Sequence, residues 1–223
     1  MAVYIVVPVF NEAPVLQEVL AELQPFYPHI VAVDDGSADA SFQILKSLPI
    51  TALRHLVNRG QGAAIQTGIT CALQKGADII VTFDSDGQHD PRDIEKLVEP
   101  IQEKKVDVTL GSRFLQNESN IPWKRRLLLW GGILFTRFTT GLPVTDTHNG
   151  LRAFSREAAS KIRFQMDRMA HASELFEILR REKLRYQEIP VSIRYTSYSL
   201  HKGQQAGDFL RILWSLAERS LFR

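Results

Sequence analysis

The sequence contains a single cysteine, Cys71, so no disulfide bond can form within the chain. Long apolar runs are also missing. The longest covers residues 127–135 and Arg137 follows it closely, whereas a helix that crosses a bilayer needs about 20 apolar residues. No basic segment precedes the first apolar stretch, which therefore predicts a strand and not a signal peptide. We expect a cytoplasmic protein, or one on the cytoplasmic face of a membrane.

An excess of charge of one sign is absent too. The 27 lysines and arginines nearly balance the 25 aspartates and glutamates, which gives a net charge of +2. A domain that binds nucleic acid usually carries a stronger basic excess, so we expect no nucleic-acid partner. With 223 residues, 44% of them hydrophobic, the chain is long enough to bury a good core as one domain.

Strand and helix patterns alternate through the first half of the chain. Short apolar runs, several of them rich in β-branched residues, predict strands at residues 3–9, 30–33, 52–56, 79–83 and 106–110. Helical patterns between them predict helices at residues 14–23 and 61–75, one from Pro91, and one that begins at Asp39 or Ser41. This alternation predicts an α/β fold, with a mostly parallel sheet and helices on both faces.

The alternation stops after residue 113. The later sequence predicts a turn or hairpin at about residues 146–154, a helix at about 170–181 and a strand at about 188–195. A last amphipathic helix is expected at about residues 208–222.

Polar residues gather where the predicted strands end. Four such clusters lie at residues 10–12, 34–35, 84–89 and 111–113. In open α/β sheets, ligands bind beyond the carboxyl ends of the parallel strands. Stability alone does not explain four polar clusters on one edge, so we expect the functional site there.

Asp84, Asp86 and Gln88 place two carboxylates and an amide oxygen at alternate positions after an apolar strand. Hard divalent cations favour such oxygen ligands and also contact phosphates. A cation held there would neutralise a diphosphate leaving group. The alternative is a loop before a helix, with His89 or Asp90 near its cap.

Residues 34–37 also allow two interpretations. A carboxylate there can accept hydrogen bonds from a ribose or from a base. Alternatively, Gly36 supplies a positive φ and Ser37 or Asp39 caps the next helix. Residues 58–62 begin a helix with two glycines but lack the Lys-Ser/Thr pair of a P-loop, which favours a tight turn.

Five motifs resemble, in their order, those of family 2 glycosyltransferases. They lie at residues 8–12 (PVFNE), 34–37 (DDGS), 84–89 (DSDGQH), 111–113 (GSR) and 146–154 (DTHNGLRAF). More narrowly, nearly the whole chain is similar to dolichyl- and polyprenyl-phosphate sugar synthases. The resemblance implies a GT-A fold and inverting transfer from a nucleotide-diphosphate sugar. It also implies a single GT-A domain over residues 1–223, with a nucleotide-binding half (1–113) and an acceptor half with amphipathic helices (114–223).

The same resemblance implies roles for individual residues. The nucleoside would be bound by Pro8, Phe10, Glu12, Asp35, Asp84 and Ser85. Mg²⁺ or Mn²⁺ would be held by Asp84, Asp86 and Gln88. An acceptor phosphate would be bound by Arg113 and Arg125. The donor diphosphate would be clamped by Arg194 and Lys202.

The acceptor decides whether a general base is needed. A sugar hydroxyl must lose its proton to a base, and the candidates for this catalytic role are Asp146 and Glu174. A phosphate monoester is already anionic at neutral pH and needs only to be positioned. Glu174 has the alternative of a solvated or capping position on an amphipathic helix, whereas the resemblance places Asp146 next to the sugar and acceptor. The Gln-x-x-Arg-Trp motif of processive synthases is absent, which favours one sugar per event.

Lys124, Arg125 and Arg126 directly precede an apolar segment, a pattern that suits the headgroup region of a membrane. The alternative is that this segment and the last helix pack on the core or on a second subunit. The sequence is therefore also compatible with a homo-oligomer. We therefore expect a hexosyltransferase that acts on a polyprenyl-phosphate acceptor as a peripheral membrane protein. The alternatives are a soluble glycosyltransferase acting on a glycan, glycolipid or small-molecule hydroxyl, and a non-catalytic nucleotide-sugar-binding protein.

Overall fold

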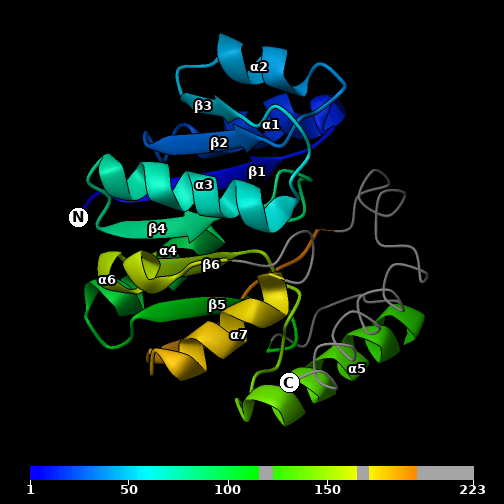
Figure 1. Ribbon diagram of the computed structural model, residues 1–223, viewed down its shortest axis with the longest axis vertical. Coiled ribbons are helices and arrows are strands. Elements are labelled where there is room, and N and C mark those ends of the chain that lie inside the picture. The colour runs from blue at the N-terminus through cyan, green and yellow to red at the C-terminus, as the bar shows by residue number, and fades with distance from the viewer. Residues whose placement is uncertain (116–122, 165–170, 195–223) are drawn as a thin grey trace.

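The computed structural model describes residues 1–115, 123–164 and 171–194. Seven strands form one sheet in the order β3-β2-β1-β4-β6-β5-β7 (Figure 1). The strands are β1 (Val3–Val9), β2 (Ile30–Asp34), β3 (Thr51–Arg54), β4 (Ile79–Thr82), β5 (Val108–Ser112), β6 (Arg152–Ser155) and β7 (Tyr186–Pro190). β6 runs antiparallel to both of its neighbours, β4 and β5, and the other pairings are parallel. The expected α/β fold with a mostly parallel sheet is confirmed.

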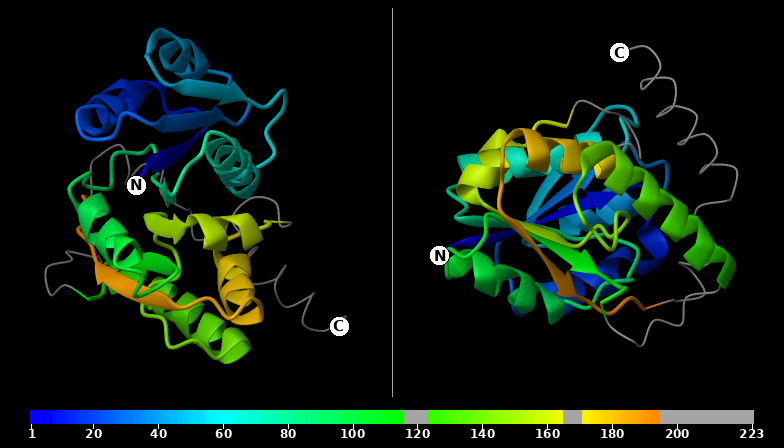
Figure 2. Two further views of the ribbon diagram at one scale, coloured as in Figure 1. Left: turned by 90° about the vertical axis from the view of Figure 1, so that its left-hand side faces the viewer. Right: turned by 90° about the horizontal axis from the view of Figure 1, so that it is seen from below.

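The two faces of this sheet carry separate sets of helices (Figure 2). One face packs against α1 (Ala13–Leu23), α2 (Ser41–Ser47) and α4 (Asp93–Gln102). The other packs against α3 (Gln61–Gln74), α6 (Arg156–Lys161) and α7 (His171–Arg181). Along β1, Val6 belongs to the core on the α3 side, while Ile5 and Val7 belong to the core on the α1 side. This alternation explains why a strand buried on both faces reads as one continuous apolar run.

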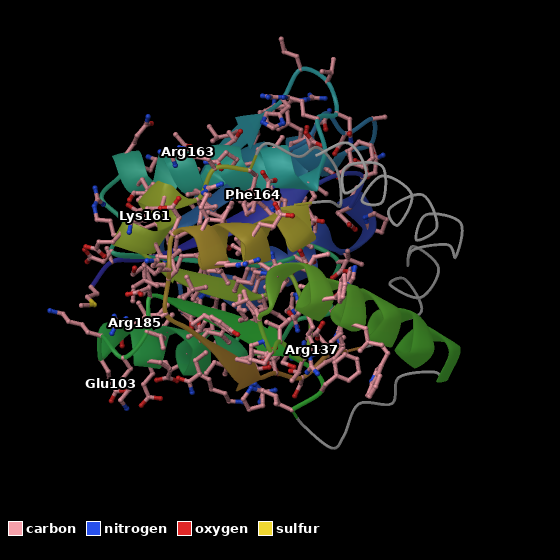
Figure 3. The ribbon with its side chains drawn as sticks, turned by 60° about the horizontal axis from the view of Figure 1, so that its bottom comes forward. Glu103, Arg137, Lys161, Arg163, Phe164 and Arg185 are labelled. Atoms are coloured by element: carbon pink, nitrogen blue, oxygen red, sulfur yellow. The ribbon has the colours of Figure 1, made fainter. Side chains whose placement is uncertain are left out.

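The remaining helix, α5 (Trp123–Thr140), lies beside α7, outside the two layers that cover the sheet (Figure 1). Among the described residues, no helix combines the length and the apolar character that crossing a bilayer requires. Arg137 of α5, labelled in Figure 3, donates from Nε to the carbonyl of Val144 at 2.7 Å. This bond ties the helix to the segment that leads into the 145–151 loop.

The ends of several elements differ from the prediction. The third strand ends at Arg54, and Leu56, predicted to be its last residue, is 99% exposed. Arg54 lies opposite Asp34 in the sheet, and its guanidinium pairs with the Asp34 carboxylate. The fourth strand ends at Thr82, one residue early, and α4 begins at Asp93, two residues after Pro91.

The fifth and the last strand begin and end at other residues than predicted. The fifth covers Val108–Ser112 instead of residues 106–110, and the last covers Tyr186–Pro190 instead of residues 188–195. The two strands pair with each other, with Val108 opposite Tyr186, and Arg185 binds the carboxylate of Asp107 just before that pair. Residues 146–154 do not form a hairpin, because their second half is β6, which pairs with β4 and β5. The helix predicted at about 208–222 lies outside the described residues.

Gly68 of α3 provides a test of the packing between this helix and β1. A Cβ at Gly68 would overlap the Cγ1 methyl of Val6. We expect Gly68→Ala to lower the free energy of unfolding by about 2 kcal/mol, because overpacking outweighs the gain in helix propensity. Urea denaturation followed by circular dichroism measures the change. The double variant Gly68→Ala, Val6→Ala should lose less unfolding free energy than the sum of the losses of the two single variants. A loss equal to that sum would contradict the contact.

Candidate active site

The candidate site lies at the carboxyl ends of β1, β2, β4 and β5, where all four polar clusters of the sequence come together (Figure 1). β6 enters the sheet from this edge because it runs antiparallel, and the 145–151 loop before it therefore lies at the same edge. The predicted position of the site is thus supported by the order and direction of the strands.

Asp35, the predicted nucleoside ligand, is 2% exposed and accepts hydrogen bonds from three groups. Its Oδ1 lies 2.7 Å from Nδ1 of His55 and 2.9 Å from the backbone nitrogen of Arg59. Its Oδ2 accepts from the backbone nitrogen of Gly60 at 2.7 Å. The carboxylate therefore anchors the segment before α3, and residues 61–62 of the predicted turn already belong to that helix.

The segment after β1 is fixed against the segment after β2. Asn11, at a φ of 54°, donates from its backbone to Ser37 Oγ and accepts through Oδ1 from the backbone of Ala38. The backbone nitrogen of Glu12 donates to Ser41 Oγ, and Glu12 itself is 7% exposed. Gly36 has the positive φ that one interpretation of residues 34–37 required. These contacts hold the segment after β1 rigidly against the segment after β2.

Three further predicted nucleoside residues lie at the end of β1 or in the loop after β4. Ser85 is buried and donates from Oγ to the carbonyl of Pro8 at 2.7 Å. Phe10, at the end of β1, keeps 42% of its surface exposed. The structure thus brings Pro8, Phe10 and Ser85 to the same edge, where part of the aromatic ring is exposed.

Asp84 is held from several directions. Gln61 of α3 donates from Nε2 to its Oδ1 at 2.8 Å, and Nε2 of His89 lies 3.2 Å from its Oδ2. Gly150 lies so close that any side chain there would overlap the Asp84 carboxylate. About a quarter of the Asp84 side chain stays exposed (25%), so the carboxylate is fixed but accessible.

Asp86 lies in an environment that disfavours its charge. Burial, and then the nearby Asp84 carboxylate, raise the pKa of the Asp86 carboxyl to about 6. His89 and a 3.0 Å hydrogen bond from the backbone nitrogen of Gln88 act in the opposite direction but do not cancel these effects. The carboxylates of Asp84 and Asp86 therefore repel each other in a partly buried site. A bound cation would relieve this repulsion.

The described residues contain no group of three or more His, Cys, Asp or Glu side chains that could hold a metal ion. Mg²⁺ and similar ions are commonly bound by one or two carboxylates, with substrate phosphates and water completing the coordination. Asp84 and Asp86 fit that incomplete donor set, with the side-chain oxygen of Gln88 as a further candidate. The donor set thus fits a cation that binds together with a diphosphate.

Arg113 and Asp146 form a buried ion pair. Arg113 Nε donates to Asp146 Oδ2 at 2.6 Å, and the two side chains are 6% and 1% exposed. The backbone nitrogen of Arg113 binds the same oxygen, and the backbone nitrogen of His148 binds Asp146 Oδ1. Both carboxylate oxygens of the candidate base therefore have protein partners.

Arg152 and His89 belong to the quoted motifs, but the sequence assigned neither of them to the binding of a ligand. Arg152 of β6 is fully buried and donates to the carbonyls of Asn149 and Thr147. Burial lowers its pKa to about 10, while the Asp84 and Asp146 carboxylates oppose that effect. His89 is 3% exposed and contacts Asp84 directly. Both residues stand within the motifs, but only the fold reveals that they contact or face these carboxylates.

The other predicted site residues divide into described and undescribed positions. Glu174 is 8% exposed in the first turn of α7. The Arg194 guanidinium pairs with Glu22 and Asp90, and its backbone nitrogen donates to the carbonyl of Gln88. It thus lies beside the Asp84–Asp90 loop. The side chain of Arg125 and the whole of Lys202 lie outside the described residues.

Comparison with known proteins agrees with this geometry. Residues 4–163 match glycosyl transferase family 2. A dolichyl-phosphate N-acetylglucosaminyltransferase of Methanococcus voltae that uses UDP-N-acetylglucosamine is 34% identical, over 96% of this chain and 94% of its own length. An uncharacterized protein of Methanocaldococcus jannaschii is 40% identical, over 99% of this chain and 93% of its own length.

A solved structure shares the fold. Glucosyl-3-phosphoglycerate synthase of Mycobacterium tuberculosis, in a complex with Mn²⁺, UDP-glucose and phosphoglyceric acid, superimposes with a TM-score of 0.71 at 17% identity. The match covers 96% of this chain and 79% of that chain. The expected GT-A fold is confirmed by this likeness.

Gly150 allows the position of the Asp84 carboxylate to be tested without altering its chemistry. Because an alanine methyl would overlap that carboxylate, we expect Gly150→Ala to displace it and to weaken Mn²⁺ binding about tenfold or more. Titration of Mn²⁺ by electron paramagnetic resonance measures the affinity. Gln74→Ala, at an exposed position in the last turn of α3, is the control. Unchanged Mn²⁺ affinity in a folded Gly150→Ala protein would contradict the assigned metal position.

Proposed function

Because the chain belongs to glycosyl transferase family 2, we propose that it moves one hexose from a nucleotide-diphosphate sugar to a polyprenyl phosphate at a membrane surface. The observation that carries this proposal is the buried pair between Arg113 and Asp146. Independent support comes from the dolichyl-phosphate transferase of Methanococcus voltae, which matches this chain over nearly the full length of both proteins.

The ion pair bears on the acceptor because it removes the best candidate base. A general base must lie within hydrogen-bond reach of the proton that it abstracts. Asp146 is 1% exposed, and its two oxygens already accept from Arg113 and from the backbone of His148. An acceptor that enters as an anion needs no such base. A phosphate monoester meets that requirement, whereas a sugar hydroxyl does not.

Arg113 then acts mainly by shaping the acceptor side of the site. Its guanidinium donates to Asp146 and, from Nη2, to the carbonyl of His148, which fixes the 146–148 loop. We assign the acceptor phosphate to Arg125 together with Arg113, whose side chain is 6% exposed. Guanidinium groups suit this task because they can engage phosphate oxygens in pairs.

The donor is assigned to the opposite side of the site. Phe10 would pack against the base of the nucleotide. The nucleoside would be enclosed by Pro8, Glu12, Asp35 and Ser85. Arg194 and Lys202 would contact the diphosphate, which requires Arg194 to leave Glu22 or Asp90. Asp84, Asp86 and Gln88 would hold Mg²⁺ or Mn²⁺. The bound cation would neutralise charge on the departing diphosphate.

The reaction that follows is one inverting displacement. An oxygen of the acceptor phosphate forms a bond to the anomeric carbon of the sugar, and the bond from that carbon to the donor diphosphate breaks. The nucleoside diphosphate leaves with the bonding electron pair. No proton is transferred, which agrees with a site whose buried carboxylate is already paired. The protein contributes by orienting the two phosphates on opposite sides of the sugar.

The surface of α5 supports an acceptor that is held in a membrane. Ile133, Thr136 and Thr140 are buried, whereas Trp130, Leu134 and Phe138 are 53%, 56% and 91% exposed. The three exposed residues follow each other at intervals of four and therefore share one side of the helix. An apolar strip of this kind suits insertion into the region between lipid headgroups and acyl chains.

Transfer to a lipid phosphate is the first test. The protein is incubated with Mn²⁺, a panel of labelled UDP- and GDP-sugars, and a short polyprenyl phosphate. We expect labelled lipid with one donor, and a loss of about 100-fold or more when a chelator is present. Polyprenol without its phosphate should give no product.

Two outcomes would contradict the proposal. Labelled polyprenol, glycan or small glycoside in place of labelled lipid phosphate would support the soluble transferase, with Asp146 or Glu174 as its base. Tight donor binding without transfer or hydrolysis would support the non-catalytic sugar-nucleotide-binding protein.

Binding to vesicles tests the α5 surface separately. The triple variant Trp130→Ser, Leu134→Ser and Phe138→Ser should lose most of its flotation with anionic vesicles, because the three side chains are exposed and apolar. Its activity on a water-soluble, short-chain acceptor phosphate should remain within about twofold. The matched control replaces three exposed residues of α4 and α7, Glu99, Gln102 and Glu177, by serine. Equal flotation of the wild-type and triple-variant proteins would contradict the membrane role.

A further inference from the structure

Residues 59–61 contact both of the carboxylates that the proposed function uses. The backbone nitrogens of Arg59 and Gly60 donate to Asp35, at 2.9 and 2.7 Å. The next residue, Gln61, donates from its side chain to Asp84 at 2.8 Å. Three consecutive residues therefore connect the end of β2 with the end of β4, across the width of the intervening β1.

This segment is fixed at its other contacts as well. Nε2 of His55 lies 2.9 Å from Thr67 Oγ1, which ties the residue after β3 to the middle of α3. The turn packs so closely on Gly36 that a Cβ there would lie 2.8 Å from the backbone nitrogen of Asn58. Gly60 takes a φ of 92° immediately before α3, a conformation that suits glycine. Gln61 therefore projects from a backbone with little freedom to move.

The chemistry of an amide suits this contact. A lysine or arginine at the same place would neutralise Asp84 and compete with a cation. The Gln61 amide donates one hydrogen bond to Oδ1, so it fixes the carboxylate while leaving its negative charge in place. Outer-shell donors of this kind commonly change metal affinity 10–100-fold when they are removed.

We infer that Gln61 is a positioning residue for the metal-binding carboxylate, through which the 55–61 segment holds Asp84 in a fixed arrangement with Asp35. The cation and the nucleoside are then bound in register on one rigid frame. This inference rests on the proposed function, since it assumes that Asp84 binds a cation and Asp35 faces the nucleoside. It adds a residue to which the sequence motifs gave no role.

Replacement of Gln61 by leucine removes the donor at similar size. We expect the Mn²⁺ affinity of Gln61→Leu, measured by electron paramagnetic resonance with saturating UDP or GDP, to fall about tenfold. The affinity for UDP or GDP, measured by calorimetry with a chelator present, should stay within about twofold, because Asp35 keeps its backbone contacts. Gln61→Asn, which retains the amide but is one methylene shorter, should resemble the leucine variant.

The matched control is Gln74→Leu, the same change at an exposed position in the last turn of α3. It should leave both affinities unchanged. A Mn²⁺ affinity of Gln61→Leu within twofold of wild type would overturn the inference, as would an equal loss in Gln74→Leu or a wild-type protein that binds no Mn²⁺. If the wild-type protein binds Mn²⁺ and Gln61→Leu weakens it, but no sugar reaches a lipid phosphate, the proposed reaction fails and the role of Gln61 stands.

Discussion

The carboxylate of Asp84 is held at the end of β4 by groups from three other parts of the chain. Gln61 approaches from α3, His89 from the following loop, and Gly150 from the loop before β6. None of these groups neutralises the carboxylate through a guanidinium or ammonium contact at hydrogen-bond distance. The fold thus confines a negative charge at the sheet edge and leaves part of it exposed. The other features of the candidate site are arranged around that charge.

The balance of charge explains why cation and diphosphate belong together in this site. Burial and the Asp84 carboxylate raise the pKa of Asp86 to about 6, so bringing the two carboxylates together is unfavourable without a counter-ion. The buried Arg152 guanidinium attracts the Asp84 carboxylate and so offsets part of this cost. A divalent cation bound to the two carboxylates keeps positive charge for further anionic ligands. A diphosphate supplies such ligands, which is why an incomplete protein donor set is suited to this chemistry.

Much of the architecture could be predicted because its signals are local. The run at Val3–Val9 reads as a strand because alternate residues such as Val6 and Val7 enter two different cores. The polar clusters predict the site because parallel strands share one carboxyl edge. Partners could not be predicted in the same way. Arg113 and Asp146 were expected to bind an acceptor and to act as a base, respectively, but they are 33 positions apart and bind each other. Their pairing depends on the antiparallel insertion of β6, for which the sequence carries no local signal.

The ion pair also connects the chemistry with the exposed surface of α5. Gly132 of that helix packs so tightly on His148 that a Cβ would lie 2.8 Å from the imidazole Cε1. The carbonyl of His148 accepts from Arg113, and its backbone nitrogen donates to Asp146. Gly132 lies between Trp130 and Leu134 in sequence, so the helix that carries the apolar strip also packs on the loop that holds the ion pair. An acceptor held along that strip would therefore lie near the loop whose candidate base, Asp146, is already paired, which suits an acceptor that arrives as an anion.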